Sequence, residues 1–204
     1  PRLSPEDVRL YLDDRAAKRF TVIQMMAIRT DLHAASPARG APVRNYAGES
    51  PFQSLDPVTL NEAYWRHIDF IVDAARQRHL VVALATMWGR DADTLFPHPL
   101  QDNERYGVLL GRRYRDRDNV IWLVTGEYGK INDDWQRDKG VISDEQRTLL
   151  RAIARGLAAG HEGRHLMTIH PITTSSADFH NDSWLDFNMQ QTWGNAAANV
   201  GRIR

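Results

Sequence analysis

Residues 20–28 read FTVIQMMAI, an apolar run with β-branched side chains and the length of a buried strand. Four further runs of this type follow at residues 80–88, 119–125, 165–170 and 186–191. Near-continuous apolar strands are typical of a parallel sheet whose faces are both covered. The sequence therefore predicts five parallel strands that lie side by side in chain order.

Amphipathic helices are expected between these strands. The first helix begins after Ser4, an N-cap serine that is followed by a proline and two acidic residues. Apolar residues then recur at helical spacing in residues 65–75, 106–114 and 149–157. Parallel neighbours need a helix-length connection, so this alternation of strands and helices predicts an α/β domain.

Two α/β architectures share this alternation, the (β/α)8 barrel and the open doubly wound sheet. The open nucleotide-binding form usually has a glycine-rich turn after its first strand, and neither G-x-G-x-x-G nor G-x-x-x-x-G-K-[ST] occurs here. The barrel is therefore the expected architecture. A complete barrel typically has about 250 residues, whereas this chain has 204. We expect one domain that forms an incomplete barrel.

The composition limits the partners that the protein can bind. Lysine plus arginine and aspartate plus glutamate both total 26, so the formal net charge is zero, and there is no basic excess to bind nucleic acid or an anionic membrane. No apolar run approaches the roughly 18 residues that span a bilayer. We expect a neutral substrate, no nucleic-acid or membrane partner, and no cofactor. The chain has no cysteines, which leaves the compartment open, and the oligomeric state is open as well.

Several motifs occur in a characteristic order along the chain. They are YLDDRAAKRFTVIQ at residues 11–24, LNEAYW at 60–65, MWG at 87–89, RY at 113–114 with NVIW at 119–122, TIHP at 168–171, and WLDFNM at 184–189 followed by Gln191. In this order the motifs resemble the apiosidase-like glycoside hydrolases, a group similar to glycoside hydrolase family 140. The motifs carry this resemblance together, and it covers nearly the whole chain.

The resemblance implies the (β/α)8 catalytic domain of a glycoside hydrolase. Members of the family have a strand before the helix that opens this chain, and two strands after residues 186–191. By that registration the five predicted strands are strands two to six, and residues 1–204 are a catalytic domain truncated at both ends. The resemblance also implies hydrolysis of plant or microbial polysaccharide side chains, including bonds to apiose in pectin, by a secreted or periplasmic bacterial protein.

Glu127 is the expected general acid/base. Hydrolysis of an acetal needs one carboxylic acid to protonate the leaving oxygen and a second carboxylate to attack or to activate water. Glu127 follows a predicted buried strand, and the active site of a barrel lies at the carboxyl ends of its strands. The family usually has Gly-Gly-Asp where this chain has Thr125-Gly126-Glu127, so the carboxylate is kept on a longer side chain. We expect a retaining enzyme whose nucleophile lies beyond residue 204.

Trp88 and His170 end two predicted strands and are expected to bind the substrate. An indole face suits the apolar C–H surface of a sugar, and an imidazole can donate to hydroxyl groups while it orients the carboxylate. Gln191, Asn188 and Trp193 are further candidates, the last in a segment where the family usually has Ser-Gly-His. The directions of Gln191 and Asn188 stay open, because alternate residues of a strand face opposite sides. Trp88 could instead pack at the barrel rim, and His170 could be a structural histidine.

Two other motifs have structural interpretations. Residues 161–165 (HEGRH) match H-E-x-x-H, which binds zinc only inside a helix. Gly160 and Gly163 instead indicate a helix end before His165, so we expect no metal. Residues 112–118 (RRYRDRD) carry charges of both signs at the end of a helix, which predicts a solvated helix end.

The leading hypothesis is a glycoside hydrolase, and the principal alternative is a barrel that binds carbohydrate without catalysis. Independently of this choice, Glu127 could be a structural loop glutamate paired with Lys130 or with an arginine. A second carboxylate about 5–5.5 Å from Glu127 would support a retaining enzyme, whereas none within about 10 Å would favour binding alone. A metalloprotease would need zinc at His161 and His165.

Overall fold

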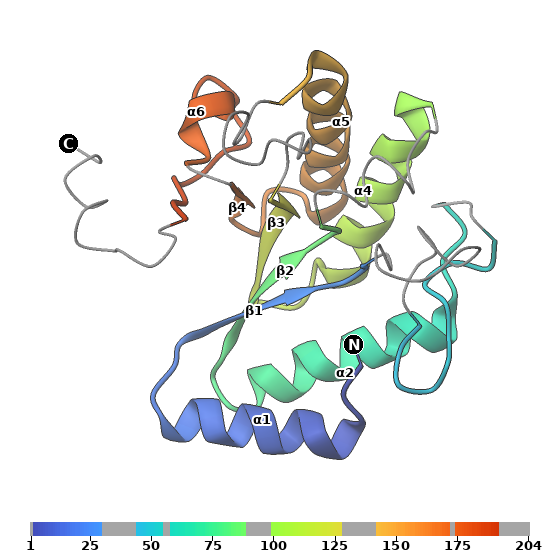
Figure 1. The fold of residues 1–204 in the computed structure, drawn as a ribbon, viewed down its shortest axis with the longest axis vertical. Coiled ribbons are helices and arrows are strands. Elements are labelled where there is room, and N and C mark those ends of the chain that lie inside the picture. Colours follow the sequence, from blue (N-terminus) through green and yellow to red (C-terminus); the bar gives the residue numbers. More distant parts are fainter. Residues whose placement is uncertain are drawn as a thin grey trace, which may run out of the picture.

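The computed structural model describes residues 2–29, 44–54, 58–88, 99–127, 142–171 and 174–191, and helices alternate with strands within them. The elements are α1 (Pro5–Ala17), β1 (Val22–Met26), α2 (Glu62–Arg76), β2 (Val81–Ala85), α4 (Leu100–Tyr114), β3 (Val120–Gly126), α5 (Asp144–His161), β4 (Met167–His170) and α6 (Ser176–Phe179). Figure 1 shows α1 and α2 side by side below β1, and α4 and α5 side by side next to β3. The longer helices therefore pack as two neighbouring pairs against the sheet.

The strands form one parallel sheet in the order β1-β2-β3-β4. Each strand pairs with the next one along the chain, and a helix lies in every crossover. The prediction of parallel neighbours in chain order is therefore confirmed for the first four predicted strands. This topology brings the carboxyl ends of all four strands to the same edge of the sheet.

The prediction of a fifth strand over residues 186–191 is wrong. The segment lies beside β4, where the Asp186 N–H donates to the carbonyl of Met167 at 2.9 Å. The Asp186 carboxylate then accepts from the Met167 N–H at 2.7 Å, and the Thr168 hydroxyl donates to the Phe187 carbonyl at 2.8 Å. Side chains thus occupy positions that backbone groups fill in a regular ladder, so the apolar run does not become a strand.

Capping residues determine where the helices begin. Ser4 Oγ accepts from the Asp7 N–H at 3.2 Å, and the Asp7 carboxylate accepts from the Ser4 N–H at 3.3 Å. This reciprocal capping box satisfies two free donors, and Ser143 and Gln146 repeat it at α5. The predicted start of the first helix after Ser4 is confirmed. None of the helices in the described ranges is long and apolar enough to cross a membrane.

The two faces of the sheet carry different side chains. One face packs into the main core with the helices, and its buried side chains on β2 and β3 include Val82, Leu84, Trp122 and Val124. The opposite face carries a smaller cluster of Ala83, Ala85 and Leu123, against which Met26, Trp88 and Met189 pack. Trp88, which follows β2, packs with the smaller cluster and therefore lies on the side away from the main core.

Four glycines let α4 and α5 approach each other closely. They are Gly107 and Gly111 on α4, and Gly156 and Gly160 on α5. A side chain at any of these positions would collide with backbone atoms of the other helix. Gly156 is the most crowded of the four, because a Cβ there would overlap the backbone carbonyl of Glu104. These glycines therefore set the distance between the two helices that precede and follow β3.

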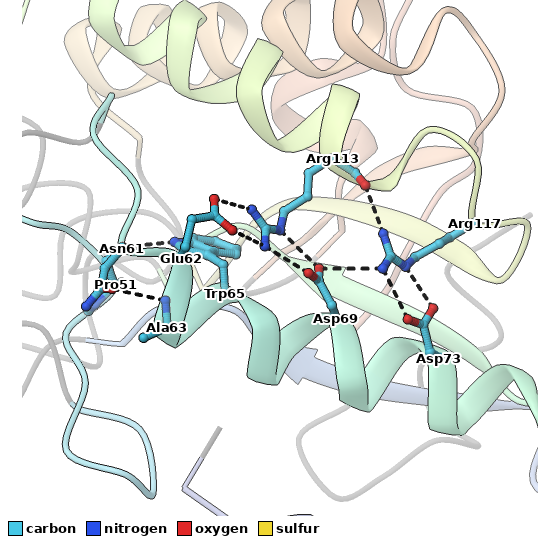
Figure 2. A network of polar contacts seen from close by, with 9 residues as sticks. All are labelled: Pro51, Asn61, Glu62, Ala63, Trp65, Asp69, Asp73, Arg113 and Arg117. Carbon is cyan, nitrogen blue, oxygen red and sulfur yellow. Dashed lines mark hydrogen bonds and ion pairs between the residues drawn. The ribbon is translucent and has the colours of Figure 1, made fainter.

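Two arginines tie the region around the end of α4 to α2 (Figure 2). Arg113 lies in the last turn of α4, and Arg117 lies three residues after the helix ends. Arg113 donates to both oxygens of Glu62, at 2.8 and 2.9 Å, and to both oxygens of Asp69, at 3.0 and 2.8 Å. Arg117 donates to both oxygens of Asp73, at 2.8 and 3.1 Å. The hydrogen bond from Arg113 lowers the pKa of Glu62. The predicted solvated helix end is wrong for these two arginines, because their partners lie on another helix.

Candidate active site

Glu127 follows β3 on a backbone that departs from regular strand geometry. The pairing of β3 with β4 shifts between Leu123 and Gly126, which is a β-bulge or a similar irregularity. Glu127 then adopts a φ of 47°, in the left-handed region that residues other than glycine seldom occupy. Its N–H donates to the carbonyl of His170 at 2.8 Å, which holds this position against β4. Bulges and left-handed residues of this kind concentrate at functional sites.

Two neutral N–H groups hold the Glu127 carboxylate. The indole Nε1 of Trp88 donates to Oε2 at 3.2 Å, and the carboxamide Nε2 of Gln191 donates to Oε1 at 3.1 Å. Trp88 follows β2, whereas Gln191 ends the segment that lies beside β4. A carboxylate has about four lone-pair positions. Each oxygen therefore retains capacity to accept a further hydrogen bond or a proton.

Trp88 occupies the space next to Gly126. The two residues pair in an isolated parallel bridge, and a Cβ at position 126 would overlap the six-membered ring of Trp88. Glycine is therefore needed for the indole to lie where it does. The ring also lies 5.1 Å from the imidazole of His170, at an interplanar angle of 41°. Trp88, Glu127 and His170 thus meet at the carboxyl ends of the strands.

His170 presents a neutral imidazole beside this carboxylate. Burial lowers the pKa of His170, and the nearby charge of Glu127 opposes that effect to a smaller extent. The ring is therefore neutral at pH 7. Its Nδ1 atom is buried and has no hydrogen-bond partner among the described residues.

The three other expected contact residues differ in their surroundings. Gln191 has a carboxamide oxygen that is buried without a partner in the described part of the chain. The oxygen of Asn188 instead accepts three hydrogen bonds from residues 174–176, at 2.8 to 3.0 Å. The structure therefore brings Gln191 to the carboxylate and uses Asn188 to hold the segment that leads into α6. Trp193 lies outside the described residues, and so does Lys130.

The HEGRH segment forms a helix end, as the sequence predicts. Helix α5 ends at His161, and Glu162 follows with a φ of 55° in the left-handed region. His161 Nε2 contacts Met167 Sδ at 3.2 Å, and His165 Nε2 contacts the carbonyl of Tyr114 at 3.0 Å. The two imidazoles thus pack in the interior with different partners and do not share one face of a helix.

Buried neutral histidines predict a loss of stability at acidic pH. Burial lowers the pKa of His161, the charge of His165 lowers it further, and Asp186 opposes these effects. Burial also lowers the pKa of His67. These folded-state values lie below the unfolded value of about 6.5, so the unfolded chain binds more protons below that pH. We therefore expect the free energy of unfolding to fall as the pH drops below about 6.5.

Denaturant unfolding at a series of pH values measures this dependence. His161→Gln should reduce the slope, because it removes one buried imidazole. The matched control is His180→Gln, which removes a ring that is exposed to solvent. A His161→Gln variant with an unaltered pH dependence would contradict the role given to this histidine.

Solved glycoside hydrolases have a similar arrangement of elements. One structure, described as a glycoside hydrolase, is 27% identical and aligns with a TM-score of 0.71 over 93% of this chain and 39% of its own. A glycoside hydrolase family 5 protein from Bacteroides vulgatus is 26% identical, with a TM-score of 0.72 over 93% of this chain and 38% of its own. GH5_18 from Streptomyces cattleya, in complex with GlcNAc, shares the fold at 20% identity, with a TM-score of 0.55 over 82% of this chain and 40% of its own.

The chain spans 38% to 40% of the length of these structures. Its parallel strands and helices correspond to a section of a (β/α)8 barrel, which confirms the predicted fold class. No curated protein matches the sequence. The family model described as "Apiosidase-like, catalytic domain" matches residues 1–203. The chain therefore belongs to the apiosidase-like family.

Proposed function

We propose that this domain hydrolyses glycosidic bonds and that Glu127 is its general acid/base. The observation that carries the proposal is the Glu127 carboxylate itself, which follows β3 on a left-handed backbone and is held by Trp88 and Gln191. The catalytic groups of barrels with parallel strands occupy this end of the sheet. The family to which the chain belongs supports the same activity.

The chemistry gives Glu127 two successive roles. As an acid it gives its proton to the leaving oxygen while the bond between that oxygen and the anomeric carbon breaks. As a base it then takes a proton from the water that attacks the anomeric carbon. In a retaining enzyme a second carboxylate, about 5–5.5 Å away, holds the sugar as an ester between the two steps. We place this nucleophile beyond residue 204, in a barrel that continues on both sides of residues 1–204.

Asp186 is not positioned to be that nucleophile. Its carboxylate accepts from the N–H of Met167 at 2.7 Å, and Met167 is the first residue of β4, whereas His170 is the last. Asp186 therefore lies at the opposite end of the strand from the candidate site. Asp91, which follows the predicted strand at residues 80–88 and is the other candidate carboxylate, lies outside the described residues.

The substrate that we infer is a neutral carbohydrate, with apiose-containing side chains of pectic polysaccharide as the first candidate. Gln191 donates to the Glu127 carboxylate, and His170 lies close enough to feel its charge. An imidazole and a carboxamide can both form hydrogen bonds to sugar hydroxyls. Asn188, through its amide nitrogen, and Trp193 are candidates for further contacts. The net charge of zero supports a neutral ligand over nucleic acid or a membrane surface. A secreted or periplasmic location in a bacterium suits a polymeric substrate.

Sugar release tests the proposed function. The protein extended at both ends by its flanking coding sequence should release monosaccharide from pectic polysaccharide, as measured by chromatography. The 204-residue chain alone should release none, because the four strands of its described residues cannot close a barrel of eight and leave sheet edges unpaired. Binding of polysaccharide by the extended protein without release would favour the carbohydrate-binding alternative. Strong activity of the 204-residue chain would contradict the need for further strands.

A further inference from the structure

We propose that Trp88 is a positioning residue for Glu127 and that Gly126 provides the space in which its indole lies. This inference rests on the proposed function, in which Glu127 is the general acid/base. It gives the indole N–H a role in orienting the carboxylate, in place of a role for the ring as a surface on which a sugar stacks.

The indole nitrogen is the part of Trp88 that faces the carboxylate. Nε1 donates to Glu127 Oε2 at 3.2 Å, and an indole N–H can only donate. Gln191 donates to the other oxygen at 3.1 Å. One donor on each oxygen selects a single orientation of the carboxylate plane. A glutamate side chain has three rotatable bonds, so without these donors its carboxylate could adopt several orientations.

The ring that carries this N–H is itself held by its neighbours. Gly126 lies so close that a Cβ there would overlap the six-membered ring, and the imidazole of His170 lies 5.1 Å away. Trp88 also packs against the small cluster that includes Leu123. Rotation of the indole would require these neighbours to move. The strands therefore set the position of Nε1, and Nε1 in turn sets the position of the carboxylate.

A positioning role and a stacking role predict different kinetics. General acid catalysis matters for a poor leaving group and hardly matters for one that departs as a stable anion. Loss of the indole N–H should therefore slow cleavage of a methyl glycoside and spare a 2,4-dinitrophenyl glycoside. Loss of a stacking surface should lower kcat/KM by the same factor for both glycosides, because both carry the same sugar.

Trp88→Phe in the extended protein makes this comparison, because phenylalanine keeps an aromatic ring and lacks the N–H. The probes are methyl and 2,4-dinitrophenyl glycosides of apiose, or of the sugar that the unmodified protein releases. We expect kcat/KM to fall about 10²-fold for the methyl glycoside and less than about threefold for the dinitrophenyl glycoside. The matched control is Trp184→Phe, since Trp184 Nε1 is buried without a partner among the described residues. Trp184→Phe should leave kcat/KM unchanged for both glycosides.

Gly126→Ala provides a second variant that keeps the indole but displaces it, and it should reproduce the selective loss. Circular dichroism identifies any variant that does not fold. If one of the two variants fails to fold, the kinetics of the other variant test the positioning role. An equal loss for both glycosides, or no loss for either, in a folded variant would overturn the positioning role. If the unmodified protein cleaves neither glycoside nor polysaccharide, the proposed function fails and this inference fails with it.

Discussion

Glu127→Gln is expected to lower turnover of the extended protein about 10²- to 10⁴-fold on substrates with a poor leaving group. The amide has nearly the same shape as the carboxylate, so the neighbouring Trp88 and Gln191 remain close to it. It has no proton to give to the leaving oxygen and cannot act as a base toward water. Steady-state kinetics measure the loss, and circular dichroism checks that the fold is retained.

The matched control for this variant is Glu6→Gln. Glu6 is exposed in the first turn of α1, so the same chemical change is made away from the site. Its turnover should equal that of the unmodified protein. Full turnover of Glu127→Gln would show that Glu127 is not the acid, and would favour a barrel that only binds carbohydrate.

Gly156→Ala is expected to destabilise the protein by about 3 kcal/mol, because the added methyl group cannot fit between α4 and α5. The Cβ would overlap the carbonyl of Glu104, which is a backbone atom of a packed helix and cannot turn aside as a side chain can. Alanine is the better helix former by about 1 kcal/mol, so helix propensity acts in the opposite direction. Thermal unfolding of the extended protein should show Tm lowered by about 10 °C.

Ala159→Gly separates the two contributions to this effect. Ala159 is exposed on the same helix, so its replacement changes helix propensity and leaves the helix contact intact. Ala159→Gly should lower the free energy of unfolding by about 1 kcal/mol. A Gly156→Ala variant as stable as the unmodified protein would show that α4 and α5 are farther apart than the structure places them.

Much of this fold could be predicted because its signals are local. Four apolar runs are strands β1 to β4, and the N-cap at Ser4 marks the start of α1. The location of Glu127 could also be predicted, since a residue that follows a buried strand of a parallel sheet lies at the carboxyl edge. The contacts of Glu127 could not be predicted, because its two partners, Trp88 and Gln191, lie 39 and 64 residues away from it in the sequence.

The segment at residues 186–191 shows why apolar composition alone is insufficient. Its composition resembles that of the other strands, but the Asp186 carboxylate accepts from the Met167 N–H and thereby takes the place of a backbone acceptor. Strand propensity cannot predict that a side-chain carboxylate will accept the hydrogen bond in place of a backbone carbonyl. The left-handed φ of Glu127 is likewise a tertiary feature, since glutamate has no preference for that region.

The close approach of α4 and α5 and the ion pairs of Arg113 were not predicted from the strand and helix patterns. Gly107 and Gly111 are four residues apart, as are Gly156 and Gly160, so each pair lies on one helix face. That spacing could have indicated close contact between the two helices. The ion pairs of Arg113 had no comparable signal, because a helix end rich in arginine looks the same whether it is solvated or paired.

Azide rescue of Glu127→Ala tests the role of Glu127 most directly. This variant of the extended protein should still form the glycosyl ester from a 2,4-dinitrophenyl glycoside but should lack the base that activates water. Azide needs no base: it attacks the anomeric carbon as the ester bond breaks, and the enzyme carboxylate leaves. We predict restored turnover and a glycosyl azide with the configuration of the substrate, identified by NMR. A glycosyl azide of inverted configuration, or no rescue, would contradict the assignment of Glu127 as the general acid/base.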